Sequence, residues 1–373
     1  MKDKKLCFVI PSFGIGGIEI NFQKLANHFN WSGYDVHIMY HAEEDNGSFQ
    51  SNFHEEIELD KLPKRKFLGN VFGYLKYFNK KKPAFVVVGM YVVAMQLIVA
   101  RFISNHKPKI IINGSAHLSS IIQYDESIKT RIILKILSKI FFSKADAIVC
   151  QSNGIKEDLL KNFSISPEKL ITIYNGVLTK NNYIHYKQTN VHRWLTPETK
   201  NFSTIIMAGR LEPQKCIVEF VDIFYAIQEK INVKMIIIGE GILKNKLVNR
   251  IKSLNLDSLI DIVDFQENFN EYIKASDVFV VNSNYEGFNN MIVHALSSGT
   301  TVISRNCPSG PSEILCDGKY GFLVQPNDDK KMISTIISAL KKPSFKTEDL
   351  IERSKLFTVE KCAAEFENLF NKI

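Results

Sequence analysis

The stretch Asn284–Thr300, NYEGFNNMIVHALSSGT, carries a carboxylate, a glycine and spaced polar side chains that together could bind a ligand. Glu286 is followed by Gly287, which permits another group to approach the backbone closely. A helix is expected to start directly afterwards. A carboxylate at such a position suits sugar hydroxyls, because these are hydrogen-bond donors.

The residues after Gly287 could complete such a site. The backbone amides of Phe288, Asn289 and Asn290 would form a helix N-terminus able to hold an anion. His294 lies four residues beyond Asn290, so the two side chains share one helix face. The alternative is a capped helix whose polar face meets only solvent.

Two cations flank a proline turn in the stretch Gly209–Lys215, GRLEPQK, which follows an expected strand. Arg210 has a forked guanidinium and Lys215 a compact ammonium, so together they could clamp a diphosphate. Open parallel sheets bind ligands at the carboxyl ends of their strands, which favours this interpretation. The alternative is a solvated basic loop.

Two glycine-rich loops also follow expected strands. In PSFGIGGIE, Gly14, Gly16 and Gly17 remove side chains just before a helix begins, and bare amides there suit a phosphate. In IIIGEGI, Gly239 and Gly241 follow a hydrophobic run. Neither loop has the full dinucleotide-binding pattern, so each could instead be a tight turn.

His117 stands alone just past the expected strand KIIIN. An isolated histidine is more often structural than functional. Its position at the ligand-binding edge of the sheet leaves both interpretations open.

Several other chemistries have no support in the sequence. The chain contains no D-x-D, so no obvious carboxylate pair could hold a divalent metal on a diphosphate. We therefore expect no metal and no cofactor. The charge of a diphosphate would then be met by Arg210, Lys215 and helix termini. No Ser/His/Asp arrangement, P-loop or nucleic-acid motif is visible.

The elements that must position these residues are short β-branched runs, each followed by a turn and a helical pattern. The first set is KLCFVI, DVHIMY, AFVVVGM, KIIIN and AIVCQS. The second set is TIIMAGR, VKMIIIG, LIDIVDF, DVFVVNS and TTVISR. Continuous apolar strands alternating with helices predict parallel sheets covered on both faces, so the fold class is α/β.

The spacing of the two sets predicts two doubly wound domains. We place the first over residues 1–180 and the second over residues 203–355. Residues 181–202 are polar and lack periodicity, which indicates a linker. Residues 356–373 contain an amphipathic helix, which could pack back on the first domain.

Composition limits the class of protein. The 373 residues are 45% hydrophobic and 23% charged, as in a soluble globular protein. The net charge of +8 favours an anionic partner, either a nucleotide, a phosphate, a membrane surface or a nucleic acid. The six cysteines lack zinc spacing and indicate free thiols in a reducing cytoplasm.

Three segments bear on membranes. Phe85–Ala100 is apolar but short for a spanning helix, and Gly89 divides it, so a buried strand followed by a packed helix is expected. Lys61–Lys82 and Lys129–Lys144 mix lysines with large apolar residues at helical spacing. Such helices can lie on an anionic bilayer. The alternative for both is a core-facing helix with a solvated basic face.

Together these loops resemble the retaining, nucleotide-sugar-dependent glycosyltransferases of the GT-B fold, family 4. The most specific part is Tyr285–Val324, where YEGFNNMIVHAL, SSGTTVIS, CPSGPSEIL and GKYGFLV follow in order. GGIE, YNGV and GRLEPQK fall at the family's expected places. The resemblance implies two Rossmann-like domains that face each other across a cleft.

The resemblance also implies roles for the residues that match its motifs. Gly16 and Gly17 match glycines that lie against the donor diphosphate, and Arg210 and Lys215 match its basic pair. Glu286 matches the first glutamate of the family's E-x7-E motif, which reads the donor sugar.

The amides of residues 287–290 would lie near the sugar and phosphate. His117 matches an N-domain histidine that touches the sugar. We expect Arg210, Lys215, Glu286 and His117 to take part in catalysis, and Gly239 to lie at the donor.

Two residues depart from the family pattern. Cys216 stands where a glycine usually follows the lysine. His294 stands where the second glutamate accepts hydrogen bonds from both ribose hydroxyls. A neutral imidazole accepts only one, so ribose binding should be weaker or rearranged, by about 1–2 kcal/mol.

The expected function is retaining, metal-independent transfer of a hexose or HexNAc from a nucleotide sugar, with UDP as the nucleotide. The acceptor would be a glycan or a lipid-linked molecule in bacterial-type polysaccharide or lipopolysaccharide synthesis. We expect a cytoplasmic protein, peripheral on the inner face of the membrane. The rivals are a nucleotide-sugar epimerase of the same fold and a degenerate, non-catalytic binding protein. A nucleic-acid binder fits the charge alone.

Overall fold

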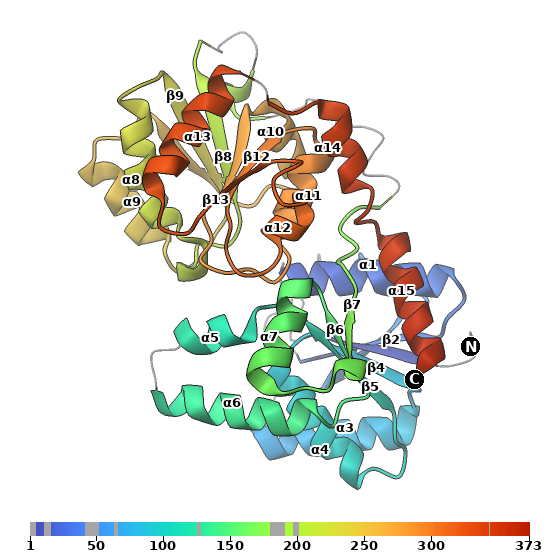
Figure 1. The fold of residues 1–373 in the computed structure, drawn as a ribbon. Helices are drawn as coiled ribbons and strands as arrows, with labels where there is room; N and C mark the ends of the chain where they lie inside the picture. Colours follow the sequence, from blue (N-terminus) through green and yellow to red (C-terminus); the bar gives the residue numbers. More distant parts are fainter. Residues whose placement is uncertain are drawn as a thin grey trace. The chain divides into compact units, whose positions relative to one another are not determined.

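The computed structural model divides the chain into two compact units, each described here by itself (Figure 1). Unit 1 comprises Met1–Val177 and Thr358–Ile373, and unit 2 comprises Leu178–Phe357. The structure describes residues 5–10, 16–41, 52–62, 66–124, 128–179, 191–196, 201–342 and 344–373. Of residues 128–130, 133 and 134 it describes the backbone alone.

Unit 1 is built on a parallel sheet in the order β3-β2-β1-β4-β5-β6-β7. Its strands are β1 Leu6–Ile10, β2 Val36–His41, β3 Glu58–Leu62, β4 Phe85–Val88, β5 Lys109–Gly114, β6 Ala147–Cys150 and β7 Leu170–Thr172. Its helices are α1 Gly17–Trp31, α3 Phe67–Lys81, α4 Tyr91–Ile103, α5 Leu118–Tyr124, α6 Ile128–Phe142, α7 Asn153–Phe163, α15 Val359–Lys372 and the 3₁₀ turn η1 Pro167–Lys169.

Each face of this sheet is covered by its own hydrophobic core. Along β1, Phe8 enters the core beneath α1, and Cys7 and Val9 enter the opposite core beneath α3, α4 and α7. This alternation follows from the two-residue period of a strand. Both faces are apolar because helices cover both, as the continuous strand pattern predicts.

Helix α15 lies in unit 1, although unit 2 precedes it in the sequence (Figure 1). Its residues Phe366, Leu369 and Phe370 are buried in the core that α1 covers. Phe370 stacks on Phe85 of β4 with ring centroids 4.7 Å apart. The apolar stripe predicted for the C-terminal helix is therefore a core surface of unit 1.

Unit 2 repeats the strand order of unit 1 in the parallel arrangement β10-β9-β8-β11-β12-β13. Its strands are β8 Ser203–Ala208, β9 Val233–Ile238, β10 Ile260–Val263, β11 Val278–Val281, β12 Thr301–Arg305 and β13 Phe322–Val324. Its helices are α8 Ile217–Gln228, α9 Lys244–Ser253, α10 Phe269–Ala275, α11 Asn290–Ser297, α12 Pro311–Ile314, α13 Asp329–Lys341, α14 Thr347–Ser354 and the 3₁₀ turns η3 Arg193–Leu195 and η5 Pro213–Lys215. Both units are doubly wound and Rossmann-like.

The ten strands predicted from sequence are all present, and the expected α/β class is confirmed. Phe85–Ala100 divides as expected into β4 and part of α4, and no helix in the described ranges is both long and apolar enough to cross a membrane. The prediction missed β3, β7 and β13. These three strands lie at sheet edges, where a side chain need not be apolar and the sequence signal is weak.

The predicted linker over residues 181–202 differs from the structure in its described part. Residues 191–196 belong to unit 2, and Trp194 is buried there. The ammonium of Lys234 lies 4.5 Å from the ring centroids of both Trp194 and Phe202. One tryptophan supplies enough apolar area to fix a segment whose average composition is polar. Residues 180–190 and 197–200 lie outside the described residues.

Candidate active site

Lys215 and Glu286 lie in the loops that follow β8 and β11. These strands are hydrogen-bonded neighbours at the centre of the unit 2 sheet, with the rest of the sheet extending in opposite directions from them. This is the topological switch point, where open parallel sheets bind their ligands. The fold therefore places two of the predicted ligand-binding residues at the expected position.

One oxygen of Glu286 is the meeting point of three donors. Oε1 accepts hydrogen bonds from Lys215 Nζ at 2.7 Å, Ser283 Oγ at 2.5 Å and Asn289 Nδ2 at 2.9 Å. Only 5% of the Glu286 side chain and 19% of the Lys215 side chain are exposed. Within the part of the chain that the structure describes, no hydrogen bond reaches Oε2. The carboxylate is therefore fixed in direction by one oxygen and can offer the other to a ligand.

Backbone contacts hold the two loops together. Gln214 donates its side-chain amide to the Tyr285 carbonyl at 2.8 Å, and the Asn284 amide donates to the Gln214 carbonyl at 2.9 Å. Asn282 donates to the Cys216 carbonyl at 2.9 Å. Sequence reasoning missed these positioning residues and Ser283. The only available signal was their adjacency to Lys215 and Glu286.

Cys216 occupies a left-handed backbone conformation, with φ of 47° and ψ of 39°, directly before α8. Glycine adopts this conformation without the steric cost that a Cβ brings. The geometry explains why a glycine suits this position and shows that the chain tolerates cysteine here. The thiol is buried, which raises its pKa to about 11.

Arg210 is set apart from the Lys215–Glu286 pair. Its guanidinium contacts Glu212 Oε1 at 2.7 Å, and 62% of its side chain is exposed. The loop that carries it is joined to the loop after β9, where the Leu211 amide donates to the Glu240 carbonyl at 2.7 Å. A Cβ on Gly239 would lie 2.0 Å from the Gly209 carbonyl oxygen. Gly239 thus has a packing role in positioning the Arg210 loop.

Helix α11 begins at Asn290, two residues later than the predicted helix N-terminus at Phe288. Asn289 is the N-cap, and its side-chain oxygen accepts a hydrogen bond from the Ile292 amide at 3.3 Å. Phe288 is buried edge-on against Phe357, and Gly287 is also buried. The start of the helix is delayed because Phe288 must enter the core first.

His294 does not meet solvent as the capped-helix alternative required. Only 7% of it is exposed, and its ring lies edge-on to Phe269 with centroids 4.9 Å apart. Asn290 is half-buried at the start of the same helix. The role of His294 toward ribose stays a prediction.

In unit 1, Gly16 is the N-cap of α1 and Gly17 its first residue. A Cβ on Gly16 would lie 2.2 Å from Oε2 of Glu19, three residues along. A glutamate at this position is typical of a capping box, in which it reaches back to the N-cap. The chain's own carboxylate thus lies at this helix N-terminus. Gly14 falls outside the described residues.

His117 precedes α5 and caps it. Its Nδ1 accepts a hydrogen bond from the Ser120 amide at 3.3 Å and lies 3.0 Å from Ser120 Oγ. Burial lowers the pKa of His117, and the nearby Asp158 carboxylate opposes that shift. With Nδ1 as the acceptor, the neutral ring carries its proton on Nε2 and can donate it to a ligand.

One group in the described ranges has metal-ligand chemistry, namely His37, Glu58 and Asp60 at the β2–β3 edge of unit 1. Lys81 forms ion pairs with both carboxylates of this group, which places an ammonium where a metal would bind. This cluster was not among the predicted site residues. Its charge is already met by protein groups.

Comparisons with known proteins agree with this architecture. A UDP complex of HepE from Anabaena has a TM-score of 0.79 at 16% identity and covers 99% of this chain and 100% of its own. The fold is therefore GT-B. Models described as "Glycosyl transferases group 1" and "Glycosyltransferase Family 4" match residues 188–357 and 15–181.

Two curated relatives extend the comparison. The N-acetylgalactosamine-N,N'-diacetylbacillosaminyl-diphospho-undecaprenol 4-alpha-N-acetylgalactosaminyltransferase of Campylobacter jejuni is 28% identical over 347 residues, 90% of each chain. The lipopolysaccharide 1,6-galactosyltransferase of Escherichia coli is 29% identical over 194 residues, 50% of each chain. The chain belongs to the group 1, family 4 glycosyltransferases, and the predicted resemblance is confirmed.

Proposed function

We propose that this glycosyltransferase moves a hexose or HexNAc from a UDP-sugar to a lipid-linked acceptor, with retention at the anomeric carbon and without a metal. The setting would be surface polysaccharide or lipopolysaccharide assembly. The relatives named above support this setting, since one acts on a diphospho-undecaprenol glycan and another on lipopolysaccharide. The HepE complex supports UDP as the nucleotide.

The observation that carries the proposal is the Lys215–Glu286 pair at the switch point of unit 2. An ammonium has three protons, and the bond to Glu286 uses one of them. The others can donate to the donor diphosphate, with Arg210 as a second cation from the same loop. Oε2 of Glu286 can accept from a sugar hydroxyl.

Catalysis would then be electrostatic. As the bond between the sugar and the diphosphate breaks, negative charge grows on the leaving oxygen, and Lys215 and Arg210 stabilise it. In the front-face course that we propose, the leaving diphosphate assists removal of the acceptor proton. No protein nucleophile is required. His117 would donate from Nε2 to the donor sugar.

Metal independence would follow from the same arrangement, because two cations replace the charge that a divalent ion would supply. The sequence has no D-x-D to hold such an ion. Activity should be unchanged by EDTA and by added Mg²⁺ or Mn²⁺. A strict requirement for either ion would contradict this part of the proposal.

A peripheral contact with an anionic bilayer is the second part of the proposal. Ile132, Ile136 and Ile140 recur every four residues on α6 and are each more than half exposed. Lys135 and Lys139 on the same helix are exposed as well. Exposed apolar side chains interleaved with lysines are typical of helices that lie in a bilayer interface.

This contact can be tested by flotation with vesicles of phosphatidylglycerol. We expect binding at low salt that the triple variant Ile132→Ser, Ile136→Ser, Ile140→Ser abolishes. If flotation is unchanged in that variant, α6 does not contact the membrane.

The main test is turnover of UDP-, GDP- and ADP-sugars with an undecaprenyl-diphosphate glycan as acceptor. We expect UDP-sugars to be used and the product to keep the donor's anomeric configuration, as read by NMR. Transfer with inversion would exclude the retaining mechanism. Release of an epimerised nucleotide sugar without acceptor would favour the epimerase rival.

The non-catalytic rival rests on His294, since it replaces the glutamate expected to bind ribose. If His294 contacts ribose, His294→Glu should tighten binding of the donor nucleotide, measured by calorimetry. Loss of binding, or no change at all, would show that His294 does not contact ribose. Absence of any turnover together with UDP-sugar binding would support the non-catalytic rival.

A further inference from the structure

Asp158 of α7 is a carboxylate that the proposed mechanism does not use, although it lies beside His117. None of its side chain is exposed. Its Oδ2 accepts a hydrogen bond from the Ser119 amide at 2.9 Å and lies 3.6 Å from His117 Nδ1. Its Oδ1 accepts from the Ser119 hydroxyl and from Asn162 Nδ2, the latter at 2.8 Å. One buried carboxylate therefore lies against both the His117 ring and the first turn of the helix that follows it.

The turn that carries His117 is held from two helices. Helix α7 holds it through Asp158, which accepts hydrogen bonds from both the amide and the hydroxyl of Ser119. Helix α4 holds it through Tyr91, whose hydroxyl donates to the Ala116 carbonyl at 3.0 Å. Because the backbone is fixed before and after His117, the ring can move only by rotation about its own side-chain bonds. The hydrogen bond to Nδ1 described above restrains that rotation.

The negative charge of Asp158 is not required by these hydrogen bonds. A neutral amide of the same shape could accept from Ser119 and would avoid the cost of burying a charge. Among the described residues, no lysine or arginine forms an ion pair with Asp158, and His117 is the one basic group within 4 Å of it. The charge therefore acts on the imidazole.

The distance between the two groups indicates how the carboxylate acts on the ring. At 3.6 Å from Nδ1, Oδ2 is too far for a hydrogen bond, so it acts through its electric field. A negative charge at this distance favours the protonated imidazole. Burial lowers the pKa of His117, and Asp158 opposes that shift. Tyr91 also faces this turn, but burial raises its pKa, so its hydroxyl stays neutral.

We propose that Asp158 is a positioning residue for His117: it fixes the turn behind the ring and supplies the negative charge beside Nδ1. The other ring nitrogen, Nε2, is left for the donor sugar. The assignment rests on the proposed function, in which Nε2 donates to that sugar. It adds a residue of α7 that acts through His117 and does not itself touch the substrate.

The first test is an NMR titration of His117 in the full chain without substrate, with the His117 signal identified by its absence from the spectrum of His117→Asn. We expect Asp158→Asn to move the titration midpoint to lower pH, because the charge that favours the protonated ring is removed while the shape is kept. The control is Asp146→Asn. Asp146 also accepts a backbone amide, from Ile110, but it precedes β6 at the opposite edge of the sheet, so the midpoint should not move.

The second test asks whether Asp158 acts through His117. Asp158→Asn should lower kcat/KM for the UDP-sugar about tenfold, because a displaced ring no longer meets the sugar in the correct geometry. In a chain that carries His117→Asn, the same change should lower kcat/KM less than about twofold. A purely structural role would give equal losses in both backgrounds. That result, or an unchanged titration midpoint, would overturn the proposal.

Ser119→Ala provides a variant that keeps the charge of Asp158. It removes one hydrogen bond to Oδ1 and should lower kcat/KM about threefold, again only in the chain that retains His117. Equal losses in the two backgrounds would also overturn the proposal, even if Asp158→Asn does not fold.

The two measurements also separate the role of Asp158 from the proposed function. If no UDP-sugar is turned over but Asp158→Asn still moves the titration midpoint, the proposed function fails and the coupling between Asp158 and His117 stands. If UDP-sugars are turned over and the midpoint does not move, the assignment of Asp158 alone fails.

Discussion

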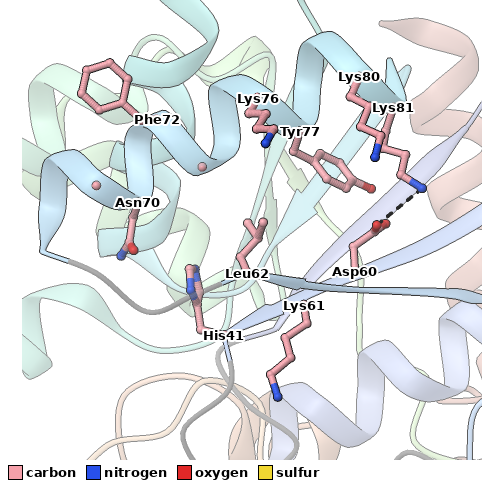
Figure 2. Close-up of a pocket in the computed structure, with 12 residues that line it drawn as sticks. His41, Asp60, Lys61, Leu62, Asn70, Phe72, Lys76, Tyr77, Lys80 and Lys81 are labelled. Atoms are coloured by element: carbon pink, nitrogen blue, oxygen red, sulfur yellow. Dashed lines mark ion pairs between the residues drawn. The ribbon is translucent and has the colours of Figure 1, made fainter.

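Unit 1 and unit 2 share a strand order but hold their cations in opposite ways. In unit 2, Lys215 is mostly buried and bonded to Glu286, whose Oε1 also accepts from Ser283 and Asn289. In unit 1, Lys76 and Lys80 are exposed on α3 and face a cavity (Figure 2). The side chains in unit 2 are held by hydrogen bonds to one another, whereas the two lysines of α3 are exposed and not ion-paired within the described residues.

The arrangement in unit 2 matches what a nucleotide-sugar donor would demand. A donor whose glycosidic bond is to be broken needs groups aimed at one atom, and preorganised groups stabilise a transition state without reorganising. Unit 2 thus has the features of a preorganised site.

The largest effect should come from breaking the fixed site. Lys215→Ala should lower kcat/KM about 10²-fold or more and destabilise unit 2 by about 2 kcal/mol, because the mostly buried Glu286 carboxylate loses its cation. Arg210→Ala should also lower turnover about 10²-fold but leave stability unchanged, since Arg210 is exposed.

Steady-state kinetics and urea unfolding measure both quantities. Normal turnover in both variants would reject the assigned roles. Equal loss of stability in the two would contradict the contrast between a buried and an exposed cation.

A smaller effect should follow from salt. Raising NaCl from about 0.05 to about 0.5 M should raise the donor KM less than about twofold, because the mostly buried Lys215 is screened less than an exposed charge would be. Initial rates with each substrate varied in turn provide the measurement. A rise in the donor KM of about fivefold or more would contradict a buried cation at the donor diphosphate.

Gly73→Ala tests by stability whether the space beside α3 is open. It should stabilise unit 1 by about 1 kcal/mol, because alanine favours the helix and its Cβ has open space. Chemical denaturation gives the free energy of unfolding, and Ala94→Gly on α4 is a control with the opposite sign. A loss of stability in Gly73→Ala would mean that the cavity is already filled by protein.

The smallest effect concerns His117, whose Nδ1 caps α5 and also lies 3.6 Å from Oδ2 of Asp158. Because its pKa is lowered in the folded state, the unfolded chain binds the proton more readily. Its contribution to stability is therefore complete above about pH 6.5 and declines as the pH falls toward the folded pKa. Urea unfolding at neutral and mildly acidic pH should show a smaller decline for His117→Asn, which keeps a capping side chain. A decline identical to wild type would exclude His117 as its source.

Much of the architecture was predictable because it depends on local patterns. Ten continuous apolar runs predicted ten strands, and the amphipathic stripe of Phe366, Leu369 and Phe370 predicted α15. The edge strands β3, β7 and β13 escaped prediction because one side of an edge strand has no neighbour, so its pattern is less constrained. The linker prediction failed at Trp194 because a single buried ring outweighs a polar average.

The sequence by itself determined the fold class and the order of the loops. It also singled out Glu286, Lys215 and His294 as candidate site residues. Only the tertiary structure decided that Lys215 and Glu286, 71 residues apart, share a hydrogen bond, whereas Arg210 turns to Glu212. Only the tertiary structure shows that α15 packs in unit 1 and that a cavity lies beside α3. Strands and helices follow from neighbours in the chain, but contacts between loops depend on strand order, which no local pattern encodes.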